Sequence, residues 1–322
     1  MAEKLNIFAR GIRKLYRMMH KCKRYNHITI SNAEVSSFLI NLIQGEKPFC
    51  AVRFGNGEFL SMQYGYLLNE SFSHRLNSFV RGYIDSYKPE ELMGTTAIQT
   101  ISFYSGFFPP KVELLDNFYK LMLRDLASVD LLGVVPWNKE DLFLDKYATN
   151  IEFCGYDRFE PYDYSNPWTM ALKGKKVLVI HPFAKTIEMQ YKRRKLLWKD
   201  PNVLPQFELK TLKAVQSLCG ESTEYDTWFD ALEAMERQID TIDFDVAIIG
   251  CGAYGFPLAV YCKKIGKKAI QLAGATQILF GIKGKRWDEM PAVNKFYNDY
   301  WVYPLPEETP KNAHKVEGGC YW

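Results

Sequence analysis

The sequence lacks paired cysteines and the short motifs of several large enzyme classes. Its 7 cysteines are scattered and include no C-x-x-C pair, so neither a zinc knuckle nor a disulfide framework is indicated. This use of cysteine suits a reducing cytoplasm. There is also no G-x-S-x-G, no H-E-x-x-H and no P-loop with its lysine, so hydrolase, zinc-protease and NTPase functions have no support.

Long apolar runs and a strong charge of one sign are missing as well. No apolar run reaches the roughly 18 residues of a membrane-spanning helix, and we expect no signal peptide because the first residues lack an apolar core and a cleavage site. The net charge of +4 over 322 residues is mild, so a nucleic-acid partner is not expected. Aromatic residues, by contrast, make up 15% of the chain, which favours clefts that stack on flat or sugar-like ligands, although many rings must fill the core.

The N-terminal segment, residues 1–27, is basic and amphipathic. Its cations are Lys4, Arg10, Arg13, Lys14, Arg17, Lys21, Lys23 and Arg24, against the single acid Glu3. Between them, apolar residues recur at helical spacing: Ile7, Phe8, Ile12, Leu15, Tyr16 and Met19. The pattern predicts a helix that lies on an anionic membrane surface or, alternatively, packs on its own domain or on a second subunit.

Apolar runs that alternate with amphipathic segments predict the fold. Strands are expected at residues 49–53, 131–135, 175–181, 209–215, 245–249 and 267–272, and helices at 33–44, 59–68, 74–86, 111–126, 186–198, 227–239 and 257–265. This order is typical of a Rossmann-like α/β fold with a mostly parallel, doubly wound sheet. We expect one α/β catalytic domain over residues 28–303, with the tail, residues 304–322, packed on it.

Two local features refine this expectation. Ser31 and Glu34 resemble a capping box that opens the helix at 33–44. Residues 136–170 are rich in Trp, Tyr, Pro, Asp and Asn, which predicts a loop-rich insert near a ligand cleft or, equally, a segment that covers the core.

The first candidate site follows the strand at 49–53, in the stretch from Arg53 to Glu58. Ligands of open α/β sheets bind at the carboxyl ends of the strands, and Gly55 and Gly57 let backbone approach a ligand closely. Arg53 suits phosphate or carboxylate, while Asn56 and Glu58 offer oxygen ligands to a hard metal ion. The alternative is a tight Asn-Gly turn in which Glu58 stabilises the start of the next helix.

The second candidate is the sequence Gly250-Cys251-Gly252-Ala253-Tyr254-Gly255. It fits G-x-G-x-x-G between a predicted strand and a predicted helix, where Gly250, Gly252, Tyr254 and Gly255 would surround a diphosphate at the helix N-terminus. A dinucleotide site also needs an acid at the end of the following strand, and residues 270–274 contain none. The alternative is a purely structural crossing of strand and helix.

Three more groups of residues follow predicted strands. His181 ends the strand at 175–181 and is a candidate general base or phosphate ligand, unless it is simply bonded to backbone; Lys185 comes next. Thr276 and Gln277 follow the strand at 267–272. The nearby cations Lys283, Lys285 and Arg286 suit an anionic ligand, and Asp288 suits sugar hydroxyls. The alternatives are a solvated basic helix and a basic surface loop.

Arg53-Phe54-Gly55-Asn56-Gly57-Glu58 resembles the Arg-Phe-Gly-Asp-Gly-Glu motif of the GT-D-type glycosyltransferases, a family first catalogued as a domain of unknown function. The similarity extends more loosely over about residues 35–285. The resemblance implies a nucleotide-sugar-dependent transferase with a Rossmann-like sheet, and an Asp-x-Glu metal motif that maps onto Asn56 and Glu58. Asn56 departs from this motif, and an amide holds a divalent ion less strongly than a carboxylate does.

We therefore expect a glycosyltransferase that moves a sugar from a nucleotide-diphosphate sugar to a surface polysaccharide or other glycoconjugate, on a glycan or lipid-linked glycan acceptor. Glu58 and Asn56 are expected to bind the donor or a divalent cation, Mn²⁺ or Mg²⁺, whose need Asn56 leaves open. Arg53, Gly252 and Lys285 are expected to hold phosphate. His181 is the candidate base, with Glu58 or Asp288 as alternatives.

The expected location is the cytoplasm, peripheral at the inner face of the cell membrane, and an oligomer is compatible with the sequence. Two other functions stay open. One is an NAD-dependent sugar-modifying oxidoreductase, which the missing ribose-binding acid argues against. The other is a non-catalytic subunit of a glycan-assembly complex, which Asn56 favours.

Overall fold

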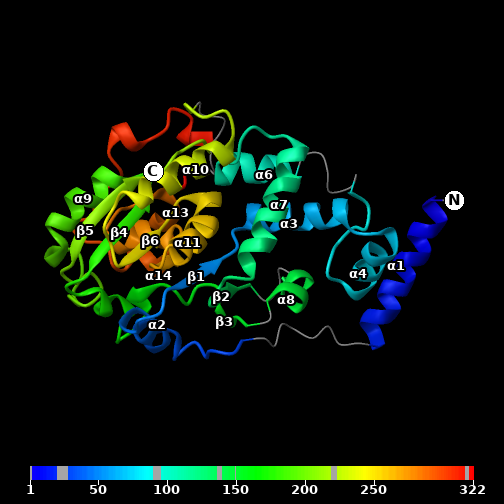
Figure 1. Cartoon of the computed structure of the whole chain (residues 1–322), viewed down its shortest axis with the longest axis horizontal. Helices are drawn as coiled ribbons and strands as arrows, with labels where there is room; N and C mark the ends of the chain where they lie inside the picture. Colours follow the sequence, from blue (N-terminus) through cyan, green and yellow to red (C-terminus); the bar gives the residue numbers. More distant parts are fainter. Residues whose placement is uncertain are drawn as a thin grey trace.

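The computed structural model describes residues 2–19, 28–89, 96–135, 140–148, 150–218, 223–315 and 319–322 of the chain. These residues form a parallel sheet of 7 strands in the order β3-β2-β1-β7-β6-β4-β5 (Figure 1). The strands are β1 Phe49–Arg53, β2 Leu131–Val134, β3 Glu152–Gly155, β4 Lys176–His181, β5 Glu208–Lys213, β6 Val246–Ile249 and β7 Lys268–Gln271. Every pairing in this sheet is parallel, as the apolar runs predicted.

The central strands are buried on both faces, and their side chains divide the core into two layers. Cys50 and Val52 of β1 point into one layer, and Phe49 and Ala51 point into the other. All five residues of β1 are buried, whereas β5 at the sheet edge alternates with exposed residues. Continuous apolar runs are therefore explained by burial on both faces of a parallel sheet.

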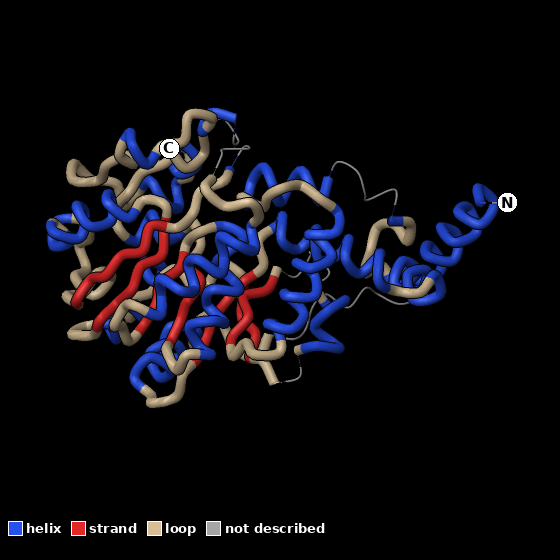
Figure 2. The backbone as a smooth tube through the Cα atoms, turned by 45° about the horizontal axis from the view of Figure 1, so that its top comes forward, coloured by secondary structure: helices blue, strands red, loops and turns tan. Residues whose placement is uncertain are grey.

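Helices cover each face of the sheet, which confirms the doubly wound arrangement (Figures 1 and 2). One layer is filled by α3 Asn56–Asn69, α6 Thr96–Ser105, α7 Val112–Leu126, α8 Asp141–Tyr147, α10 Trp228–Asp240 and α11 Gly255–Lys264. The opposite layer contains α2 Val35–Gln44, α9 Ala184–Lys192, α12 Ala275–Leu279, α13 Lys285–Asp288 and α14 Pro291–Asn294.

Several predicted elements differ in detail. The capping box at Ser31 is wrong: α2 begins at Val35 with no side-chain cap, because the Ser31 hydroxyl donates to the Glu34 carboxylate instead of accepting from the helix. The basic helix is shorter than predicted, since α9 ends at Lys192 and a separate turn, Arg194–Leu196, follows it.

The segment 136–170 is more regular than the predicted loop-rich insert. It contributes α8 and β3, the outermost strand next to β2. Its residues 136–139 and 149 lie outside the described part of the chain. The strand was missed because β3 is only 4 residues long and has an exposed first residue, so no buried apolar run marks it.

The predicted N-terminal helix is α1, Ala2–Met19; residues 1 and 20–27 of that predicted segment lie outside the described residues. It packs against α4, Phe72–Arg81, whose C-cap is Gly82. Helix α4 is shorter than the predicted helix at 74–86. Figures 1 and 2 show α1 at the end of the molecule farthest from the sheet. Within the described residues, no helix is both long enough and apolar enough to cross a membrane.

Candidate functional site

Four strands bring the predicted site residues to one edge of the sheet. In the order β1-β7-β6-β4 they are neighbours and parallel, so their carboxyl ends share that edge. The chain leaves β1 and β6 toward α3 and α11 on one face, and leaves β4 and β7 toward α9 and α12 on the other. Loops that diverge to opposite faces mark the place at which open α/β sheets bind ligands.

Arg53 ends β1, and its two terminal guanidinium nitrogens are bonded within the protein, while its Nε has no hydrogen-bond partner among the described residues. One guanidinium nitrogen donates to the Tyr156 carbonyl at 2.8 Å and to the Glu160 carboxylate at 3.0 Å, and another donates to the Leu272 carbonyl at 2.6 Å. Only 4% of the Arg53 side chain and 14% of the Glu160 side chain are exposed. Arg53 therefore joins the ends of β1, β3 and β7, and its contacts are structural.

Glu58 lies in the first turn of α3 with its carboxylate folded back over Gly55. A Cβ at position 55 would stand 2.0 Å from Glu58 Oε2, so only glycine leaves room for this arrangement. Glu58 is 5% exposed, and Oε2 is buried without a hydrogen-bond partner among the described residues. Burial raises the pKa of Glu58, against the opposing effect of hydrogen bonds from its own amide and from the Ser105 hydroxyl.

Asn56 and Gly57 differ from Glu58 in their surroundings. Asn56 is exposed, whereas Gly57 is buried where α3 crosses α6: a Cβ there would lie 3.0 Å from Ser105 Oγ and 3.1 Å from Ile101 Cα. The described residues contain no group of three or more His, Cys, Asp or Glu side chains able to hold a metal ion. A cation at this turn would thus have the free Glu58 oxygen and the Asn56 amide, and would need phosphate or water oxygens to complete its shell.

The glycine sequence at the end of β6 is closely packed. A Cβ at Gly250 would meet the Ala273 carbonyl at 2.5 Å, and one at Gly255 would meet the Gln271 amide at 2.9 Å. Gly252 has φ +58° and approaches the Ser105 carbonyl, yet it is exposed to solvent. The glycines thus permit the crossing of β6, β7, α6 and α11, and Gly252 alone of the three leaves backbone open to a ligand.

Two more findings bear on a dinucleotide at this loop. Tyr254 is 1% exposed and stacks on Trp228 with ring centroids 4.9 Å apart, so it belongs to the core. At the end of the next strand stands Gln271, whose side-chain oxygen accepts from the Arg53 amide at 3.0 Å. A ribose-binding acid would have to occupy that strand end.

His181 ends β4 and is 5% exposed. Its Nδ1 accepts a hydrogen bond from the Phe183 amide at 3.0 Å, which puts the proton of the neutral ring on Nε2. Burial lowers the pKa of His181 to about 3. A neutral ring with such a low pKa is a poor proton acceptor at neutral pH, so the geometry favours the backbone-bonded alternative over a general base.

Glu308 of the tail occupies the N-terminus of α9, beside His181. Its carboxylate accepts from the Lys185 amide at 2.7 Å, from the Thr186 amide at 3.1 Å and from the Thr186 hydroxyl at 2.5 Å. Helix N-termini favour anions because unpaired N–H groups and the helix dipole face them. Here a carboxylate of the chain itself takes that position. The Lys185 side chain is exposed, 3.7 Å from Glu307.

The residues after β7 hold the end of the tail. The Gln277 amide donates to the Lys283 carbonyl at 2.6 Å and to the Tyr321 carbonyl at 2.8 Å. Thr276 is fully buried, and its hydroxyl has no partner among the described residues. Trp322 contacts Phe183 after β4, with ring centroids 6.1 Å apart. The described part of the tail thus covers the edge at β7 and β4.

The predicted basic loop and its acid also contact neighbouring aromatic side chains. Asp288 accepts from the Tyr297 hydroxyl at 3.2 Å and from the Tyr303 hydroxyl at 2.7 Å, and Lys283 lies over the Tyr297 ring. The Arg286 guanidinium stacks on Tyr321 at 4.8 Å. Lys285 is exposed at the start of α13. These contacts build a surface layer beside the tail, with Lys285 and Arg286 on its outer side.

Three residues that matter at this edge were not predicted: Ser105, Glu160 and Glu308. Each contacts a group far away in the sequence: Ser105 contacts Glu58, Glu160 contacts Arg53, and Glu308 contacts the start of α9. One signal was present, because an internal Arg at a buried strand end requires an acid. Nothing local identifies which acid it is.

No protein-family model matches the chain, and neither does any of the curated proteins or solved structures compared with it. The function is therefore inferred from the residues at this edge.

Proposed function

We propose that the protein is a glycosyltransferase that binds a nucleotide-diphosphate sugar at the end of β1. The observation that carries the proposal is the Glu58 carboxylate. It lies at the carboxyl edge of a doubly wound sheet, in space that Gly55 leaves open, and one of its oxygens is buried with no hydrogen-bond partner among the described residues. A buried carboxylate oxygen left unpaired costs free energy, so such a group is typical of a site that is completed by a ligand.

In this proposal Glu58 and Asn56 bind the donor end of the site. When a divalent cation is bound there, it neutralises charge that develops on the departing diphosphate. Gly252 offers exposed backbone next to this turn, and Lys285 and Arg286 offer positive charge beyond β7. Arg53 holds the turn in position through Glu160 rather than holding phosphate, and His181 is not needed as the base.

The remaining parts of the proposal concern the acceptor and the place of action. The acceptor is a glycan or lipid-linked glycan of a surface polysaccharide or glycoconjugate, and the enzyme acts in the cytoplasm at the inner face of the membrane. The N-terminal helix α1 supports a membrane-bound acceptor because it combines basic and exposed apolar residues.

The test measures donor binding by calorimetry and donor hydrolysis or transfer with a panel of nucleotide sugars, with and without Mn²⁺. Glu58→Gln is expected to lower turnover at least about a hundredfold, as removal of a group that stabilises transition-state charge does. Glu113→Gln is the matched control, since Glu113 is a first-turn glutamate of α7 away from this edge, and it should leave turnover unchanged. No binding and no turnover with any donor would refute the proposal.

One observation favours the second candidate, a non-catalytic subunit of a glycan-assembly complex. The Arg53 guanidinium, which would face phosphate in a donor site, is instead paired with Glu160, and Asn56 replaces a carboxylate. The same variants separate the candidates. A Glu58→Ala protein with full activity in the assembled complex would support the subunit, while loss of activity with the fold intact would support the enzyme.

A further inference from the structure

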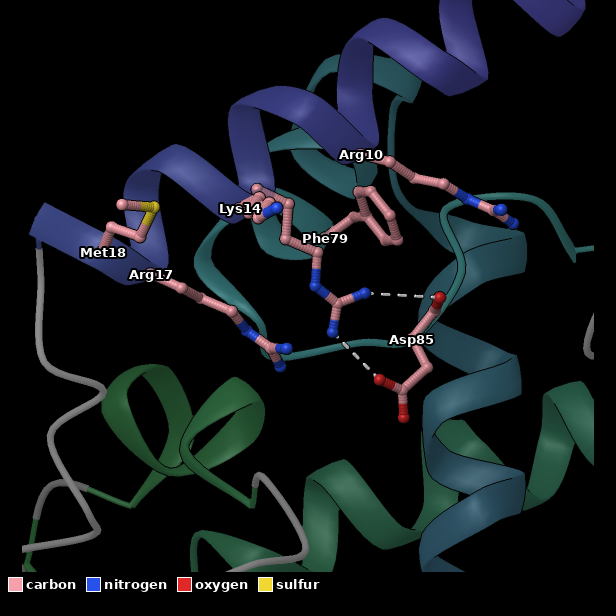
Figure 3. A pocket seen from close by; sticks show the side chains of 7 residues that line it. Arg10, Lys14, Arg17, Met18, Phe79 and Asp85 are labelled. Carbon is pink, nitrogen blue, oxygen red and sulfur yellow. Dashed lines mark hydrogen bonds and ion pairs between the residues drawn. The ribbon is translucent and has the colours of Figure 1, made fainter.

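Helix α1 has three sides, and one of them packs on α4. Ala9 is 2% exposed and Arg13 has a 12% exposed side chain. The Arg13 guanidinium lies over the Phe79 ring at 4.5 Å and pairs with Asp85 at 3.0 Å (Figure 3). These contacts attach one side of α1 to the rest of the protein, and its other two sides face outward.

The second side of α1 is apolar and exposed. Its residues follow helical spacing and have large exposed fractions: Ile7 69%, Phe8 67%, Ile12 39%, Leu15 55%, Met18 74% and Met19 65%. An apolar stripe on a helix of a globular protein normally faces the core. A contiguous exposed stripe of this kind marks an interaction site.

The third side is basic and adjoins the apolar side at Met18. Arg10, Lys14 and Arg17 border a surface hollow of about 590 Å³ between α1 and the loop after α4. Its acidic lining residue, Asp85, is the partner of Arg13. Among the described residues no acid pairs with Arg10, Lys14 or Arg17, so the hollow carries net positive charge.

We infer that α1 binds the surface of a membrane that contains anionic lipids, with its apolar side among the acyl chains and the phosphate headgroups at the basic hollow. Charge decides between the possible occupants. A second copy of the chain, docked on the same side, would bring the same cations together, whereas an anionic bilayer neutralises them. A helix with adjoining apolar and cationic sides lies in the membrane interface rather than across it. This inference deepens the proposed place of action at the membrane by naming the lipid class and the contact surface, and its test needs no transferase activity, so either proposal can fail without the other.

The experiment uses the full chain and phosphatidylcholine vesicles with or without phosphatidylglycerol, and measures the bound fraction by co-sedimentation. We expect the protein to bind anionic vesicles. Binding should weaken as the salt concentration rises from about 0.1 M to about 1 M, because the Debye length shortens from about 10 Å to about 3 Å. Lys14→Glu should lower partitioning at least about fivefold, because one cation strengthens binding to an anionic surface by about that factor. Leu15→Asp should lower it at least about tenfold through lost apolar burial.

Matched controls lie in the turn after α9, where Lys195 and Leu196 are both exposed. Lys195→Glu and Leu196→Asp change the same charge and the same apolar area but should leave vesicle binding unchanged. The inference is overturned if wild-type protein does not bind anionic vesicles, or if Leu15→Asp binds as well as wild type. It is also overturned if light scattering shows a dimer that Leu15→Asp dissociates while vesicle binding is absent.

Discussion

Two buried glutamates lie in comparable places at the carboxyl edge of the sheet, and their environments are opposite. Glu58 belongs to the helix after β1, and one of its oxygens has no partner in the part of the chain that the structure describes. Glu308 comes from the tail to the helix after β4, where both of its oxygens accept hydrogen bonds. Each helix N-terminus thus has an anion near it, but one anion is supplied locally and the other from more than 120 residues away.

The comparison separates an end of the edge that the tail closes from the end at which we propose that a ligand binds. At β4, the tail covers Phe183 and the start of α9, and the anion position is occupied by Glu308 of the chain itself. At β1, the turn has an exposed Asn56 and a carboxylate that lacks one partner. Among the described residues, Glu160 Oε2 and Thr276 Oγ1 are also buried without a partner, so the contrast rests on Glu58 together with its exposed neighbour Asn56. The following predictions test this contrast.

The largest expected effect is at Arg53, which the comparison treats as part of the structure. Arg53→Ala should lower the free energy of unfolding by about 3–5 kcal/mol because it leaves the buried Glu160 charge without a partner. Urea unfolding of the variant and the wild-type protein measures this change in free energy. Arg237→Ala, which breaks the exposed pair with Glu233, should change stability little. A stable Arg53→Ala protein that has lost only ligand binding would show that Arg53 serves the ligand after all.

At the closed end, Glu308→Gln should lower the free energy of unfolding by about 2–3 kcal/mol. The amide replaces one of two acceptor oxygens, so an N–H group of α9 loses a charge-assisted bond. Glu307→Gln is the control. Glu307 is next to Glu308 in the sequence, but its side chain is exposed and lies 3.7 Å from the Lys185 amine. If the two variants were equally stable in urea unfolding, this would contradict the role of Glu308 as the anion that stabilises the N-terminus of α9.

Acid should destabilise the closed end through His181. The pKa of His181 is lowered to about 3 by burial, so below about pH 6.5 the unfolded chain binds a proton that the folded chain does not. The contribution of His181 to stability is therefore greatest above that pH and falls as the pH is lowered from about 6.5 toward 3. Urea unfolding across this pH range should show that stability depends less steeply on pH in His181→Gln than in the wild-type protein.

The smallest effect has the opposite sign and belongs to Glu58. Glu58→Gln should raise the free energy of unfolding by about 1 kcal/mol at neutral pH, because it removes a buried charge with an unpaired oxygen. Since the pKa of Glu58 is raised in the fold, this gain should shrink as pH falls toward about 4, where the unfolded chain also binds the proton. Destabilisation by Glu58→Gln at neutral pH would mean that its carboxylate is structural, as that of Glu308 is.

Much of the fold was predictable because local pattern is sufficient for it. Residues 246–249 and 49–52 are continuous apolar runs, and such runs form strands wherever both faces of a sheet are covered. The short edge strand Glu152–Gly155 was missed because it is neither long nor fully buried. The candidate turn was found for the same local reason, since Gly55 and Glu58 are only three residues apart and meet within one helical turn.

The partners of the polar groups could not be predicted in the same way. Arg53 suited phosphate by its chemistry, but the fold places Glu160 against it, and Gln277 and Asp288 are likewise engaged by segments far along the chain. A guanidinium or carboxylate pairs with whichever group the fold brings near, and sequence pattern carries no record of that distance. Local sequence pattern thus predicts most of the strands and helices and the turn at Arg53–Glu58, whereas long-range packing decides which groups surround Glu58 and that Glu308 closes α9.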